Sequence, residues 1–76
     1  MLIQILGTGC AKCHKLADNA AQAAKELGLD ATVQKVTSID EIMKFGVMVT
    51  PGLAVNGVVK SVGRVLSTEQ IKPLLT

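Results

Sequence analysis

The pattern of apolar and polar positions along the chain predicts alternating strands and helices. Residues 2–6 form a nearly continuous apolar run ended by Gly7, which is typical of a buried strand entering a tight loop. From about residue 11 to residue 27, apolar residues recur at spacings of three and four, polar residues fill the other face, and Gly28 follows as a C-cap. This second segment is therefore expected to be an amphipathic helix.

The middle of the chain predicts a second strand and a second helix. Residues 30–36 are rich in Thr and Val with partial alternation, which indicates a strand. Ser38, with Glu41 three residues later, forms a capping-box pattern that opens a short helix. This helix is expected to reach about Phe45, because Gly46 follows.

Two more strands and a last helix are predicted in the final third of the chain. Residues 53–55 and 58–62 flank Asn56-Gly57, a strong signal for a two-residue hairpin turn. Ser67 and Gln70 form a second capping box, so a helix is expected from there to about residue 75.

This order of elements predicts an α/β fold of the form β-α-β-α-β-β-α. Strands separated by helices pair in parallel through crossovers, whereas the hairpin adds antiparallel strands. We therefore expect one domain over residues 1–76, with a four-stranded mixed sheet and helices on both faces. Pro73 is expected to limit the regularity of the last helix.

Composition narrows the function classes. The chain has 76 residues, a net charge of +2, a single Phe and no Trp or Tyr, which argues against a nucleic-acid partner. No apolar run is long enough to cross a membrane and no basic segment precedes the first apolar stretch, so we expect a cytoplasmic protein without a membrane partner. We expect a monomer. Such a small chain buries a small core, so its chemistry is expected near the surface.

Cys10 and Cys13 are the candidate chemical site, because the loop after the first strand lies where open α/β sheets place their sites. At a helix start, unpaired backbone N–H groups and the helix dipole stabilise a thiolate, and Lys12 adds a positive charge, so the pKa of the Cys10 thiol is expected below its free value of about 8.5. Cys10 would then attack a disulfide, and the more buried Cys13 would resolve the mixed disulfide.

Three other interpretations use the same residues. The two cysteines could simply be small buried apolar residues. With His14 they also match the attachment signature of c-type haem. Residues 8–13 resemble, in addition, the loop with which copper-chaperone-type domains hold a soft metal ion. The expected helices near residues 38–45 and 67–75 do not fit that family's element order, yet metal or metalloid transfer stays open as the alternative function.

The motifs together resemble the thioredoxin fold in its shortest, glutaredoxin-sized form. The closer resemblance is to small archaeal and bacterial thioredoxin-like proteins known as redox-active disulfide proteins. The segments that carry it are residues 7–13, 46–53, 56–59 and 63–65.

This resemblance implies roles for individual residues. Cys10 corresponds to the attacking cysteine and Cys13 to the resolving one. Pro51 corresponds to a proline in a cis peptide bond that positions the substrate, and the Thr50 backbone to a partner for an extended substrate segment. A thiol reductant or thioredoxin-reductase-like donor and disulfide-bearing proteins are implied as partners, with no bound cofactor and no metal. The chain departs from thioredoxins in lacking their Trp and in carrying Gln4 where they have a buried acid.

The apolar stretch at residues 47–49, with Leu53 and the hairpin, allows two interpretations. Ordinary core packing is the favoured one, because strand residues of this kind are usually buried. An apolar rim for a protein partner, in a binding module whose disulfide acts as a switch, is the alternative.

Overall fold

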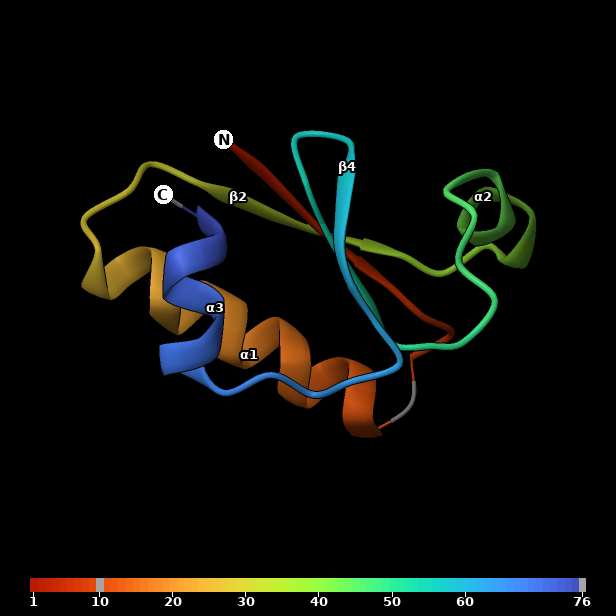
Figure 1. The fold of residues 1–76 in the computed structure, drawn as a ribbon, viewed down its shortest axis with the longest axis horizontal. Coiled ribbons are helices and arrows are strands. Elements are labelled where there is room, and N and C mark those ends of the chain that lie inside the picture. The colour runs from red at the N-terminus through yellow and green to blue at the C-terminus, as the bar shows by residue number, and fades with distance from the viewer. Residues whose placement is uncertain (10, 76) are drawn as a thin grey trace.

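The computed structural model describes residues 1–9 and 11–75 and contains the expected order of strands and helices (Figure 1). The elements are β1 (Leu2–Leu6), α1 (Ala11–Glu26), β2 (Thr32–Val36), α2 (Ile39–Lys44), β3 (Gly52–Val55), β4 (Val58–Val62) and α3 (Thr68–Leu75). Among the described residues no helix is both long enough and apolar enough to span a membrane.

The four strands form one mixed sheet in the order β2-β1-β3-β4. β1 pairs in parallel with β2, with Leu6 opposite Val36, and antiparallel with β3. β3 pairs antiparallel with β4, and a register shift falls between Leu53 and Ala54. The mixed sheet predicted from the sequence is thus confirmed, with the two most buried strands, β1 and β3, at its centre.

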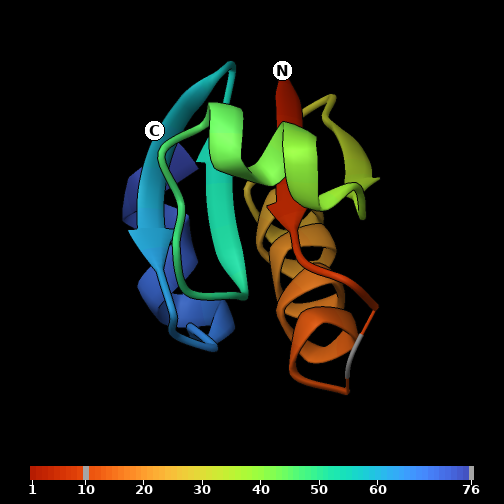
Figure 2. The same cartoon turned by 90° about the vertical axis from the view of Figure 1, so that its right-hand side faces the viewer.

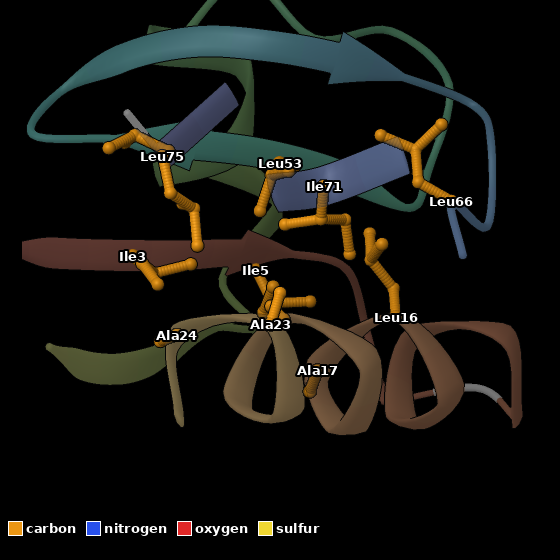
Figure 3. Packing of buried hydrophobic residues seen from close by; sticks show 12 residues of the cluster. Ile3, Ile5, Leu16, Ala17, Ala23, Ala24, Leu53, Leu66, Ile71 and Leu75 are labelled. Atoms are coloured by element: carbon orange, nitrogen blue, oxygen red, sulfur yellow. The ribbon is translucent and has the colours of Figure 1, made fainter. Parts of the chain in front are cut away.

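Helices cover both faces of this sheet, as predicted. α1 and α3 lie side by side on one face, and α2 lies on the other (Figures 1 and 2). The larger core lies between the sheet and the helix pair α1 and α3 (Figure 3). Its buried residues are Ile3, Ile5, Leu16, Ala17, Ala20, Ala23, Ala24, Leu53, Val55, Leu66, Ile71 and Leu75. A smaller core lies under α2 and contains Leu6, Val36, Ile42, Val47 and Ala54.

The predicted hairpin turn and the predicted end of the first helix both contain a glycine with a positive φ angle. Asn56 and Gly57 both have positive φ angles, 52° and 85°, as a tight two-residue hairpin turn requires. Gly28, with a φ of 68°, ends α1, and the N–H of Leu29 donates to the carbonyl of Ala24 in a Schellman-type cap. α1 itself ends at Glu26, one residue earlier than predicted.

One of the two predicted capping boxes is wrong. Ser38 does occupy the N-cap of α2, but its side chain makes no capping hydrogen bond there. The second box is confirmed, because Ser67 Oγ accepts from the N–H of Gln70, and Gln70 Oε1 accepts from the N–H of Ser67. α3 continues through Pro73 to Leu75, so this proline does not end the helix.

Candidate functional site

The candidate site lies where β1 ends and α1 begins. Cys10 falls outside the residues that the structure describes, so the site is built from its neighbours. Cys13 sits in the first turn of α1, and its side chain is only 5% exposed, which confirms the prediction that the second cysteine is buried. Lys12 is exposed beside it. The helix start thus carries one buried thiol and one solvated positive charge.

Gly7 lies against the Cys13 sulfur. A Cβ atom at residue 7 would overlap Cys13 Sγ and would lie 3.8 Å from Thr50 Cβ. The N–H of Gly7 donates to the carbonyl of Val36 at 2.9 Å, which joins the end of β1 to the end of β2. Only a residue without a side chain leaves room for the sulfur at this point. Gly7 therefore brings the Cys13 thiol and Thr50 together.

The Thr50–Pro51 peptide bond is cis, as the resemblance implied. Pro51 is buried and Thr50 is exposed. The Pro51 carbonyl accepts a hydrogen bond from the N–H of Gly63 at 2.8 Å, which attaches this segment to the end of β4. Thr50 therefore lies beside Gly7 at the end of β1, although the two residues are far apart in sequence.

Two polar side chains near the site have partners that the sequence did not reveal. The exposed His14 lies with its Nδ1 3.3 Å from Lys35 Nζ on β2. Gln4, which the resemblance sets where thioredoxins carry a buried acid, donates from Nε2 to Gln34 Oε1 at 3.0 Å. The Gln4 side chain is thus hydrogen-bonded to the neighbouring strand β2. The parallel register of β1 and β2 sets Gln4 directly opposite Gln34, and this register is the signal that predicts the pair.

A hollow of about 280 Å³ opens beside Thr8 and Thr50. It lies between α2 and the segment that follows α2, and it is mainly apolar. Its remaining lining residues are Ile39, Ile42, Met43, Val47 and Met48. No group of three His, Cys, Asp or Glu side chains within residues 1–9 and 11–75 is placed to hold a metal ion. Because Cys10 is not among those residues, the two-thiolate metal alternative stays a prediction.

The three residues of the apolar stretch at 47–49 differ in burial. Val47 is buried in the core under α2 with 2% exposure, as favoured from the sequence. Core packing is wrong for Met48 and Val49, which are 82% and 58% exposed. Val47 belongs to the core under α2, whereas Met48 lines the open hollow beside that helix. Met48 forms an apolar rim beside Thr8 and Thr50 together with Ile39 and Met43, which are 62% and 56% exposed.

Comparisons with known proteins agree with this geometry. The family described as "Thioredoxin domain" matches residues 1–76. A protein named thioredoxin from Methanothermobacter thermautotrophicus is 51% identical over 76 residues, which is all of this chain and 99% of the relative. A thioredoxin from Methanocaldococcus jannaschii is 44% identical over 72 residues, covering 95% of this chain and 83% of the relative. The chain belongs to the thioredoxin domain family, and the resemblance seen in the sequence is confirmed.

Proposed function

We propose that this protein is a thiol–disulfide oxidoreductase that works through Cys10 and Cys13. The observation that carries the proposal is the position of Cys13: a buried thiol in the first turn of α1, packed on Gly7, which also lies beside Thr50. Full-length similarity to proteins named thioredoxin supports the same class of activity. Cys10 lies three residues before Cys13, so a helix start at this point suits the formation of a disulfide between them.

In the proposed reaction, the Cys10 thiolate attacks one sulfur of a substrate disulfide. The substrate S–S bond breaks, a mixed disulfide forms, and the first substrate sulfur leaves as a thiolate and takes up a proton. Cys13 then loses its proton and attacks the Cys10 sulfur, which releases the second substrate thiol. The substrate gains two electrons and two protons, and the Cys10–Cys13 pair is oxidised to a disulfide. A thiol reductant or a thioredoxin-reductase-like donor returns the pair to two thiols.

The neighbouring residues are assigned supporting roles. The exposed ammonium group of Lys12 would stabilise the Cys10 thiolate by its charge. The exposed Thr50 backbone would pair with an extended segment of the substrate, and the buried Pro51 would position that segment beside the thiols. Disulfide-bearing proteins are the proposed substrates, a monomer is the proposed state, and the cytosol, where thiols are kept reduced, is the proposed compartment.

Trapping the mixed disulfide tests this mechanism. In the Cys13→Ser variant the resolving thiol is absent, so oxidised insulin or another protein disulfide should remain attached to Cys10 and be released by dithiothreitol. The Cys10→Ser variant is the matched control and should trap much less, because Cys13 is buried. Failure of Cys13→Ser to trap any protein disulfide over a range of redox buffers would contradict the mechanism.

A further inference from the structure

Two methionines stand on the rim of the hollow beside the site. Met43 projects from α2 and is 56% exposed, and Met48 follows α2 and is 82% exposed. A side chain with this much exposure contributes little to the core, so packing does not account for the sulfur of Met48. The remaining methionine, Met1, is 41% exposed and lies at the other end of β1. The chain therefore holds its two most exposed thioethers at one place.

That place adjoins the candidate redox site. Met43 and Met48 line the same hollow as Thr8, two residues before Cys10, and as Thr50, which lies near Gly7 and Cys13. A protein whose disulfide approaches the thiols has to come close to this rim. The polarity of the two methionine side chains therefore bears on how such a protein is bound.

We propose that Met48 and Met43 are oxidation sites for hydrogen peroxide and related peroxides, and that their oxidation slows exchange with protein disulfides. The second half of this inference rests on the proposed function. In the reaction, the thioether sulfur attacks a peroxide oxygen, an S–O bond forms and the O–O bond breaks. The sulfur loses two electrons, and the rest of the peroxide takes them up with a proton, leaving as water from hydrogen peroxide or as an alcohol from an organic hydroperoxide. The product, methionine sulfoxide, is polar and is restored by methionine sulfoxide reductases.

The consequence follows from the chemistry of the rim. In the thioether form, Met43 and Met48 give flexible apolar surface that can adapt to different partners. Each sulfoxide oxygen is a strong hydrogen-bond acceptor that would lose water if an apolar side chain covered it. Small disulfides need no contact with the rim, because their two sulfurs can reach the thiols directly. Oxidation should therefore act on large substrates and spare small ones.

The first experiment measures which methionines are oxidised. The protein is first converted to its disulfide form, so that both cysteine sulfurs are protected, and is then treated with limiting hydrogen peroxide. Trypsin separates the three methionines into the peptides 1–12, 36–44 and 45–60. We expect one added oxygen atom on the Met48 peptide first, then on the Met43 peptide, with Met1 slowest. Oxidation of Met1 as fast as that of Met48 would overturn the assignment of the site.

The second experiment measures the effect on exchange. After dithiothreitol has regenerated the cysteines, the oxidised protein should reduce insulin with kcat/KM lowered by about tenfold, the loss expected when apolar contact of a few methylene groups is removed. Its rate with hydroxyethyl disulfide should stay unchanged. The Met43→Leu/Met48→Leu variant keeps the apolar rim without its sulfurs, so its rates with both disulfides should be the same after the treatment as before it.

The outcomes separate this inference from the proposed function. An unchanged rate with insulin in protein whose Met43 and Met48 carry oxygen would overturn the effect on exchange. An equal fall in the insulin rate of the treated Met43→Leu/Met48→Leu variant would overturn it too, because peroxide would then act on the rate through other residues. If the untreated protein reduces neither disulfide, the proposed function and the effect on exchange both fail, whereas the order of oxidation still upholds or overturns the modification site.

Discussion

At the scale of single residues, the site depends on the absence of a side chain at Gly7. The backbone of Gly7 closes the end of β1 onto Val36 of β2, and its Cα faces Cys13. Any β-carbon there would meet the Cys13 sulfur before it met another atom. Gly7 is therefore a positioning residue for the Cys13 thiol.

The variant Gly7→Ala should destabilise the protein by about 1–3 kcal/mol, because an added methyl group forces the packed sulfur or the backbone to move. Denaturant unfolding of the reduced protein measures this loss. The displaced sulfur should also resolve mixed disulfides more slowly, which stopped-flow measurement with a protein disulfide would detect.

The double variant Gly7→Ala/Cys13→Ala separates this contact from a general effect on the strand end. With the sulfur removed, the overlap is gone and the nearest atom to the methyl group is the β-carbon of residue 13 at 3.3 Å, so the loss caused by Gly7→Ala should shrink by at least about 1 kcal/mol in the Cys13→Ala background. Equal losses in both backgrounds would show that the sulfur contact does not matter.

How much the sequence predicts at this scale differs between residues. The roles proposed for Cys10 and Cys13 rest on their spacing and their place after a strand, whereas the burial of Cys13, which its position inside the helix predicts, is confirmed. The exposure of Met48 does not follow, because an apolar residue in a loop is buried or exposed according to which element covers it, and this depends on distant parts of the chain.

At the scale of elements, the helix pair α1 and α3 is held by apolar packing and by two polar links. Asn19 Nδ2 donates to the carbonyl of Leu66 at 2.9 Å and attaches α1 to the segment before α3. Lys72 Nζ on α3 lies 2.7 Å from Glu26 Oε1 at the end of α1 and 3.0 Å from Glu69 Oε1. The Asn19–Leu66 and Lys72–Glu26 links connect residues that the chain separates by more than forty positions.

The charged link should give stability a dependence on pH. The hydrogen bond from Lys72, and then that from Gln22, lowers the pKa of Glu26 from its ordinary 4.5. The hydrogen bonds to Glu26 and then to Glu69 raise the pKa of Lys72 from 10.5. The Glu26 contribution is present above pH 4.5 and is lost as the pH falls through its lowered pKa. The Lys72 contribution is present below pH 10.5 and is lost as the pH rises through its raised pKa.

The variant Lys72→Gln should therefore lower the melting temperature at neutral pH by a small amount, as expected for a solvated pair. The difference from the wild type should disappear in strong acid, where Glu26 is protonated, and should shrink in high salt. Lys60→Gln is the control, because Lys60 makes no ion pair with the described residues. A fall in melting temperature that is equal for both variants, or that does not change with pH, would contradict the assigned role of the link.

The elements themselves are largely predictable from the sequence. Hydrophobic periodicity places all the helices and strands within a few residues, and the Asn56-Gly57 turn follows from its sequence signature. The Ser38 cap is not predictable in detail. Its pattern permits a side-chain hydrogen bond, but whether the bond forms depends on the rotamer chosen when α2 packs on the sheet. Likewise, Asn19 on the polar face of α1 gave no sign of its bond to Leu66.

At the scale of the whole molecule, β3 holds the two cores together. Leu53 faces the core beside α1 and α3, whereas the next residue, Ala54, faces the core under α2. All four residues of β3 are buried, whereas in β4 only partly exposed and exposed residues occur. This contrast is already visible in the sequence, because β4 contains Lys60 and Ser61. It could have indicated that the first strand of the hairpin, and not the second, lies beside β1.

The variant Leu53→Ala should cost about 2–5 kcal/mol, because Leu53 is fully buried in the larger core and its truncation leaves a cavity. Val58→Ala on the edge strand, 57% exposed, should change the free energy of unfolding by less than about 0.5 kcal/mol. Urea unfolding of both variants measures the two changes in the free energy of unfolding. Similar losses in the two variants would mean that β3 does not have the central place described.

The central claim is that Cys10 and Cys13 form one reversible, two-electron redox pair, and a redox equilibrium measures this most directly. The protein is equilibrated in dithiothreitol buffers of graded potential, the thiols are alkylated, and whole-protein mass gives the fraction in each state. We predict that both thiols disappear together into one intrachain disulfide, with a change of about 30 mV per tenfold change in the ratio. Two cysteines that react independently, or that stay reduced at every potential, would contradict the account.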